Sequence, residues 1–501
     1  MNVSTEALKQ STLYASSIQG GNIDYDSFRY DLEKSYPNIF KDRHVRKEFT
    51  GLKNATLGGN SDSVEIAAFG LARKMYLKTT ITFAAPANAT IQSMNVASHL
   101  YKAFISRVAL LNSSREIAQL HGDTLQWKAI AGNGDRGQKF KELLAGKHNL
   151  QLNSTKIEVA ENLANEIVLG NGTAQSITFY TNLPWTFLEG KFQSDDGKKT
   201  SALSNYRFLE TCRVLLEVAP RAEIVAGTTT TDITVPKIEK CELIVNYDIP
   251  ESNAMLEIEK QYSLDVPLSV LVGNEVLTES SVTATATTTT HSVKVFNTNL
   301  AKGFLVCVHA QRSETNARAL GALITSGASN GVDDLAVAPA DTAKTKAITT
   351  HILNNAMCRY HSTGTNDVSR YGSDYKKINA LTIKSSGRVL FEATTYEELL
   401  LMTTPHTNWL DVCHGNIYEL SQTMDKNSCN DTNFYWIPFG EKENLNSFTG
   451  GLALKGLATC DIEVTFPSVD TVPYAVKVYT IHHNIISVDA NSGRLIQSVS
   501  A

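Results

Sequence analysis

The sequence is short of the features that mark several large classes of protein. It holds 12 prolines and 4 tryptophans among 501 residues, and no apolar run approaches the ~18 residues that a membrane-spanning helix needs. Its 46 basic and 51 acidic residues leave a net charge of -5, so bulk charge gives no reason to expect sequence-specific binding of nucleic acid. The first residues lack a basic region followed by an apolar one, so we expect no secretory signal peptide.

Close cysteine pairs are missing as well. The chain has 7 cysteines, an odd number, and none of them stands in a Cys-x-x-Cys pair. Without a secretory signal, this usage predicts reduced and mostly buried thiols, and the wide spacings exclude the usual zinc sites. The seven are Cys212, Cys241, Cys307, Cys358, Cys413, Cys429 and Cys460.

The motifs that come nearest to chemistry fall short of it. The glycine-rich segment 132–137 has no following Gly-Lys-Ser/Thr, so we interpret it as a loop between two helices and not as a phosphate loop. His482 and His483 are consecutive, and consecutive residues of a strand point to opposite faces, so they are poorly placed to bind one metal ion. Cys413 and His414 are neighbours in sequence only, which does not make a nucleophile and its base.

Aromatic residues could instead indicate sugar binding. Trp185 and Trp436 lie in two aromatic stretches that contain proline, and we interpret them as core or sandwich-edge residues. The sequence thus predicts no catalytic, cofactor-binding or metal-binding residue, no cofactor and no enzyme activity.

What the sequence has in quantity is β patterning. Alternation of apolar and polar residues, typical of a half-buried strand, runs through 212–218 and 460–466 and places Cys212 and Cys460 on the buried faces. Further strands are expected at 294–295, 304–308 and 474–481. Helical patterning predicts helices at 25–35, 115–131, 138–144, 159–167 and 395–402.

Three features occur in the same order in both halves of the chain. A strand, a polar turn and an arginine fill 105–117 and again 378–390, and each is followed by a helical pattern. Then come the aromatic stretches with proline, 179–187 and 434–439, and the two alternating strands. Arg388 follows Arg115 by 273 positions, Pro438 follows Pro184 by 254, and Cys460 follows Cys212 by 248. This predicts two tandem β-domains of one design.

Short strands with long loops that contain helices favour sandwiches over propellers or up-and-down barrels. We therefore predict a mostly β protein of two tandem jelly-roll sandwiches with helices inserted in long loops. The expected division is an N-terminal arm at 1–47, because that segment is polar and of mixed charge, a first jelly roll at 48–258 and a second at 259–501.

Several short motifs give this pattern a family. The segments 71–80, 105–117 with His121-Gly-Asp-Thr-Leu125, Leu183-Pro-Trp-Thr-Phe187, 202–214, 378–390, 476–479 and the tail 484–500 occur in the order of their counterparts in the double jelly-roll major capsid proteins of nucleocytoplasmic large DNA viruses, virophages and polinton-like viruses. The sequence resembles that family over residues 48–501. It departs from it in Asn112-Ser113-Ser114, where the family has turn glycines, and in a tail with the single glycine Gly493.

The resemblance implies a virion shell subunit that forms homotrimers, which tile an icosahedral DNA-virus capsid as six-sided capsomers. It also implies minor capsid or penton proteins and a membrane beneath the shell as partners, with assembly in the host cytoplasm or nucleus. The long segment 312–376 corresponds to the family's outward tower loop. The alternative is a tandem β-sandwich protein for glycan binding or host attachment.

Overall fold

The computed structural model describes the greater part of two β-sandwiches and the joint between them. The described residues are 29–31, 41–66, 71–84, 92–96, 100–113, 115–131, 166–169, 172, 174–185, 199–201, 212–227, 236–249, 268–282, 289–295, 300–310, 378–403, 434–439, 451–454, 460–466, 474–488 and 495–499. Among them, no helix has both the length and the apolar character to cross a membrane.

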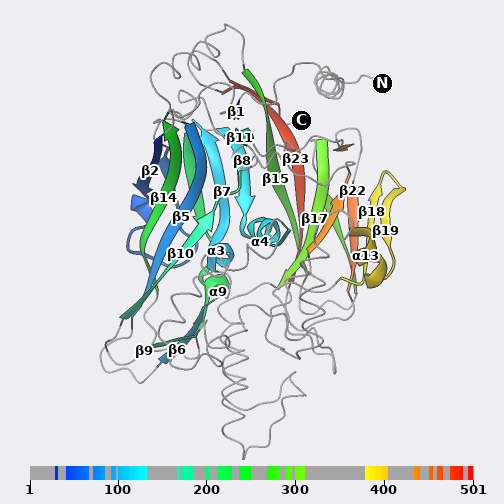
Figure 1. Ribbon diagram of the computed structural model, residues 1–501. Coiled ribbons are helices and arrows are strands. Elements are labelled where there is room, and N and C mark those ends of the chain that lie inside the picture. Colours follow the sequence, from blue (N-terminus) through cyan, green and yellow to red (C-terminus); the bar gives the residue numbers. More distant parts are fainter. Residues whose placement is uncertain are drawn as a thin grey trace, which may run out of the picture.

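The first sandwich is made of two antiparallel sheets (Figure 1). One has the order β10-β5-β14-β2, with β3 also paired to β14. The other has the order β4-β12-β7-β8. The strands are β2 (Lys41–Glu48), β3 (Ala55–Thr56), β4 (Ser61–Glu65), β5 (Leu71–Ala84), β7 (Ile105–Asn112), β8 (Arg115–His121), β10 (Ala174–Asn182), β12 (Cys212–Val218) and β14 (Lys237–Ile249).

The second sandwich has the same construction. Its sheets have the orders β15-β23-β17-β20, with β21 and β24 attached, and β16-β22-β18-β19. The strands are β15 (Leu268–Val282), β16 (Thr290–Val295), β17 (Leu300–Ala310), β18 (Ala380–Ser385), β19 (Arg388–Ala393), β20 (Phe434–Pro438), β21 (Leu452–Ala453), β22 (Cys460–Thr465), β23 (Tyr474–Val488) and β24 (Leu495–Val499). Read strand for strand, the two orders show that the chain folds the same design twice.

The match extends to irregularities of single residues. Ser113 and Ser386, the first turn residues of the hairpins β7–β8 and β18–β19, both adopt a left-handed backbone, with φ of 55° and 48°. Each hairpin then carries one extra residue on its second strand, Ile117 or Leu390. Both pairs are separated by 273 positions, so the repeat predicted from the sequence is confirmed down to its β-bulges.

The predicted alternating strands are confirmed too. β12 and β22 occupy the same place in their sheets, and Cys212 and Cys460 both lie on the buried side, as do Val214 and Val464. Because one face of each strand meets the core and the other does not, the buried residues recur at every second position.

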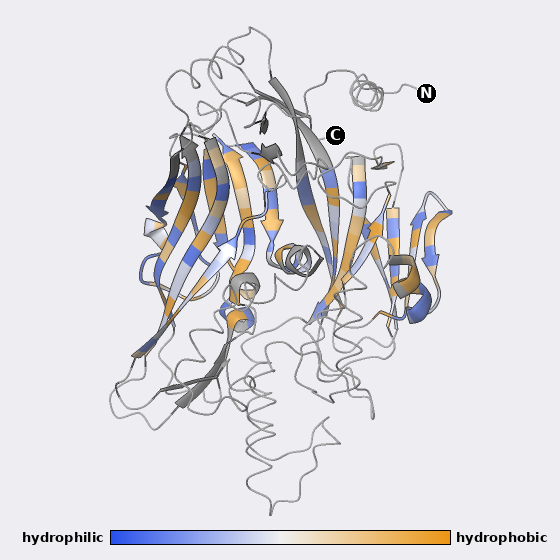
Figure 2. Ribbon diagram, viewed as in Figure 1, coloured by the Kyte–Doolittle hydropathy of each residue, from blue (hydrophilic) through white to orange (hydrophobic). Residues whose placement is uncertain are grey.

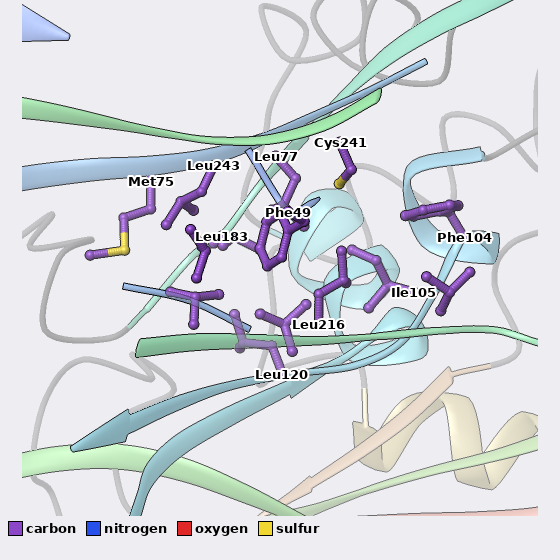
Figure 3. Packing of buried hydrophobic residues seen from close by; sticks show 14 of the residues in the cluster. Phe49, Met75, Leu77, Phe104, Ile105, Leu120, Leu183, Leu216, Cys241 and Leu243 are labelled. Carbon is purple, nitrogen blue, oxygen red and sulfur yellow. The ribbon is translucent and has the colours of Figure 1, made fainter. Parts of the chain in front are cut away.

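Each sandwich encloses an apolar core between its sheets. The first core includes Phe49, Leu77, Phe104 and Leu216, all fully buried, and Figure 3 shows their side chains packed together. The second core is a separate cluster with Phe304 among its buried members. Figure 2 shows hydrophobic positions alternating with hydrophilic ones along the strands of both.

Three of the predicted helices need correction. Residues 115–131 divide into the strand β8 and the helix α4 (Gly122–Ala131), because both faces of β8 are covered and its buried run lacks the alternation that marks a strand. Arg29–Asp31, inside the helix expected at 25–35, is the strand β1, which pairs with β11 (Lys199–Ser201). The end of the helix expected at 159–167 belongs to the strand β9 (Glu166–Leu169), which is held by pairing with β6 (Gln92–Val96).

The helix expected at 395–402 is confirmed as α13 (Tyr396–Thr403). Its start is capped, since Thr395 Oγ1 accepts a hydrogen bond from the backbone N–H of Glu398 at 3.2 Å. The predicted helix at 138–144 lies outside the described residues. The remaining short elements are η1 (Thr50–Leu52), α3 (Leu100–Ala103), α9 (Arg221–Ile224) and β13 (Val225–Gly227).

The predicted arm, residues 1–47, overlaps a strand. β2 begins at Lys41 and pairs along its whole length with β14 as the edge strand of the first sandwich. Its residues 43, 44, 46 and 47 are exposed, which explains why their polar composition resembled that of a tail. The division into 48–258 and 259–501 stays a prediction.

Candidate functional site

The structure places the residues with chemical potential in packing roles. Of the predicted thiols, Cys212, Cys241, Cys307 and Cys460 are described; all are buried and form no disulfide. Burial raises the pKa of Cys212 and of Cys241 to about 12, so neither thiol ionises readily. Within the described ranges, His, Cys, Asp and Glu form no group of three suited to a metal ion.

The other candidates divide into those that the structure describes and those that it does not. Trp185 is 1% exposed and belongs to the first core, as predicted. His482 is also 1% exposed, with its Nδ1 3.4 Å from the carbonyl oxygen of Thr480. Segment 132–137 and the pair Cys413–His414 lie outside the described residues, as does 312–376.

The main functional feature of the described fold is the joint between the two sandwiches. The helix α4 of the first sandwich lies between β8 and the sheet β15-β23-β17-β20 of the second (Figure 1). Its Trp127 stacks on Trp436 of β20, with ring centroids 5.1 Å apart and planes at 39°. Both rings are 1% exposed, and they belong to a third apolar cluster together with Leu305, Cys307, Phe434, Tyr479 and Ile481.

This cluster depends on a close approach between strands. Gly303 of β17 faces Trp436, and a Cβ added there would lie 2.5 Å from the indole ring and 2.5 Å from the carbonyl oxygen of Ile437. Any larger residue would therefore push the ring out of its position under α4.

A buried carboxylate forms the polar centre of the joint. Glu275 of β15 is 2% exposed, and its Oε1 accepts hydrogen bonds from His121, both from the backbone N–H at 2.7 Å and from Nδ1 at 3.0 Å. The Thr124 hydroxyl donates to the same oxygen. A carboxylate buried this deeply is tolerated because the opposite sandwich supplies several donors.

Backbone groups of β8 and β15 add to this contact. The N–H of Gln119 donates to Asn274 Oδ1 at 2.8 Å, and the Gln119 side-chain amide donates to the carbonyl oxygen of Glu275. The edge of β15 is therefore covered by side chains and backbone of β8, which also protects that edge from pairing with another strand.

A second ionic contact lies beside the first. Asp123 Oδ2 of α4 accepts a hydrogen bond from the Tyr479 hydroxyl at 2.6 Å and lies 3.0 Å from Lys477 Nζ on β23. Burial alone would lower the pKa of Lys477, but the charge of Asp123 raises it above its ordinary value. Burial and the Asp123 charge also raise the pKa of Tyr479, which keeps its hydroxyl protonated as a donor.

This arrangement joins two sandwiches rigidly and offers no exposed reactive group. Sequence reasoning missed the joint as a site, although the motif His121–Leu125 that supplies most of its donors was one of those used for the family resemblance. That motif was the available signal, since His, Asp and Thr together at a strand–helix boundary are polar residues placed where the structure is buried.

Comparison with known proteins gives no match to a family model and none to a curated sequence. Comparison with solved structures does. The capsid of the virus PBCV-1 is similar with a TM-score of 0.51 and 12% identity, covering 93% of this chain and 98% of the other. PBCV-1 VP54, fitted into a reconstruction of the virophage Sputnik, is similar with a TM-score of 0.53 at the same identity and coverage.

The Faustovirus major capsid protein is similar with a TM-score of 0.54 and 8% identity, covering 90% of this chain and 91% of the other. At such identities a likeness speaks for the fold and not for shared site residues. Over nine-tenths of its length, the chain has the double jelly-roll fold of these viral capsid proteins.

Proposed function

We propose that this chain is the major capsid protein of a DNA virus, a structural subunit whose trimers tile an icosahedral shell. The observation that carries the proposal is the pair of sandwiches of identical strand order, rigidly joined, whose fold matches viral capsid proteins over nearly the whole chain. Two equivalent sandwiches in each of three copies would make a six-sided block.

The site chemistry is consistent with this structural role. The residues of the joint are fully engaged with one another, and the buried thiols have raised pKa values. Catalysis is therefore no part of the proposal, and neither is a cofactor. Self-association is the primary partnership, and the resemblance adds minor capsid or penton proteins and a membrane under the shell. The proposed location is the virion, after assembly in the host cytoplasm or nucleus.

Two segments outside the described residues complete the proposal. We expect the residues before β2 to reach neighbouring capsomers, minor proteins or lipid on the inner side of the shell. We expect 312–376 to form an outward loop that stabilises the trimer. Both expectations rest on the resemblance and on the length of the segments.

The glycan-binding alternative receives less support. A sugar-binding sandwich needs accessible aromatic rings, whereas Trp127, Trp185 and Trp436 are each 1% exposed. These are the tryptophans of the described part of the chain.

Mass measurement in solution, followed by electron microscopy, separates the two functions. The capsid proposal expects a particle of three 54.8 kDa chains that forms shells or sheets of six-sided blocks at high concentration. A monomer that stays monodisperse at every concentration and binds a glycan panel would overturn the proposal.

A further inference from the structure

The second sandwich leaves exposed the elements that the first sandwich buries in the joint. β19 and α13 correspond to β8 and α4, at the same separation of 273 positions. Most of β8 is buried, whereas β19 is mostly exposed. The exposed large apolar residues of the described chain gather on β19 and α13: Val389 at 51%, Leu390 at 42%, Leu401 at 73% and Met402 at 41%. An apolar group of this kind is typical of a contact surface.

The counterpart of the strand that meets β8 is equally identifiable. β2 pairs with β14 as β15 pairs with β23, at the outer edge of the matching sheet. The neighbouring strands, β5 and β17, each carry one extra residue, Arg73 and Lys302, which fixes the register between the two sandwiches. Next to these bulges the aligned residues are Lys74, Asn246 and His44 in the first sandwich and Gly303, Ile481 and Glu275 in the second.

By this register His44 takes the place of Glu275, and Arg43 takes the place of Asn274. Both His44 and Arg43 are exposed. The edge of the first sandwich therefore presents hydrogen-bond donors where the edge of the second presents acceptors.

The opposing elements have changed in the reverse sense. Glu392 of β19 stands at the position of Gln119, and Glu397 of α13 at that of Thr124. Both glutamates are exposed. Donors on β8 and α4 are thus replaced by carboxylates on β19 and α13, so the roles of donor and acceptor are exchanged as a set.

We propose that β19 and α13 of one copy dock on β2 and the outer face of its sheet in a second copy. In this contact Glu392 pairs with Arg43 and Glu397 lies near His44, around the apolar group of Leu401 and Met402. The inference rests on the proposed function, because it names the surface through which the trimer forms. It also explains why the two joints do not compete: donors of the first joint would meet donors on β2.

The position of the two surfaces suits a closed ring. Figure 1 shows β2 and β19 at opposite ends of the molecule, one in each sandwich. A contact between two different surfaces of identical chains is heterologous, and it generates a ring when the rotation closes. Each copy would contribute both surfaces once.

Charge exchange tests the pairing in the full-length chain. The variants Arg43→Glu and Glu392→Arg place like charges in the contact, and we expect each to fall from the mass of three 54.8 kDa chains to that of one. The double variant restores opposite charges, and we expect it to recover the trimer. The matched control exchanges Glu65 and Arg213, an exposed ion pair within one sheet, and should remain trimeric.

A third variant protects the test against misfolding of the β2 edge. Leu401→Lys changes a side chain that is 73% exposed, so its circular dichroism and unfolding midpoint should match the wild type while the trimer is lost. Single charge variants that stay trimeric, or a double variant that stays monomeric although folded, would overturn the assigned surface and leave the capsid proposal intact. A wild-type chain that never forms trimers or shells would overturn the capsid proposal itself.

Discussion

Replacement of Glu275 by alanine removes the acceptor at the centre of the joint and leaves its donors behind. The backbone N–H of His121, its Nδ1 and the Thr124 hydroxyl all lose the oxygen that they share. Since His121 is 7% exposed and Thr124 is fully buried, water cannot easily replace the carboxylate. Removing one partner of a buried charged contact costs about 3–5 kcal/mol, so we expect a loss of that order in the free energy of unfolding.

Urea unfolding followed by tryptophan fluorescence measures this loss, because Trp127 and Trp436 stack at the joint. Glu275→Gln keeps the size of the side chain and one acceptor oxygen, so it should lose about 1–2 kcal/mol. Glu279→Ala, an exposed position on the same strand, is the matched control and should change stability by less than about 0.5 kcal/mol. Equal unfolding curves for Glu275→Ala and Glu279→Ala would refute the role assigned to the carboxylate.

Three further predictions concern the cores and the joint. Val214→Asp or Val464→Asp puts an unpaired charge into a core and should cost several kcal/mol, whereas Glu217→Lys or Glu463→Lys should cost much less; similar thermal midpoints for the two kinds would contradict the register of β12 and β22. Trp127→Ala should lose about 3–5 kcal/mol and shift the emission of the remaining tryptophans to longer wavelength, and an unchanged spectrum would mean that α4 does not cover Trp436. Burial lowers the pKa of Lys302 to about 7 from 10.5, so the unfolded chain binds more protons between these values and this residue makes stability rise with pH from about 7 to 10.5; the difference in unfolding midpoint between wild type and Lys302→Met should shrink over that range, and a constant difference would show that Lys302 is not desolvated.

Sequence reasoning succeeded where one face of a strand is buried and the other is not. β12 and β22 alternate for that reason, and the repeat of their positions revealed the duplicated design. It failed at β8, whose faces meet the first core on one side and β15 on the other, so that the alternation disappears. The short strand β1 was missed because its pairing with β11 depends on residues far away in the chain.

The joint could not be predicted for a related reason. His121 and Glu275 are 154 positions apart, and neither residue alone differs from a surface residue in a sequence. Only the placement of two sandwiches against each other turns Glu275, Asp123 and Tyr479 into one buried network. Local patterns contain no information on that placement.

The matching β-bulges at Ile117 and Leu390 have a consequence for how the chain can change in length. The extra residue lets Glu116 and Gln119, which both contact Arg107, share the outward face, while Ala118 and Leu120 enter the core. Loss of one residue at this point would put the wrong set of side chains on each face of the rest of β8. Insertions and deletions should therefore be excluded from these two hairpins, whereas the loops between the strands can vary in length, so that size differences among related chains would accumulate outside the paired frame.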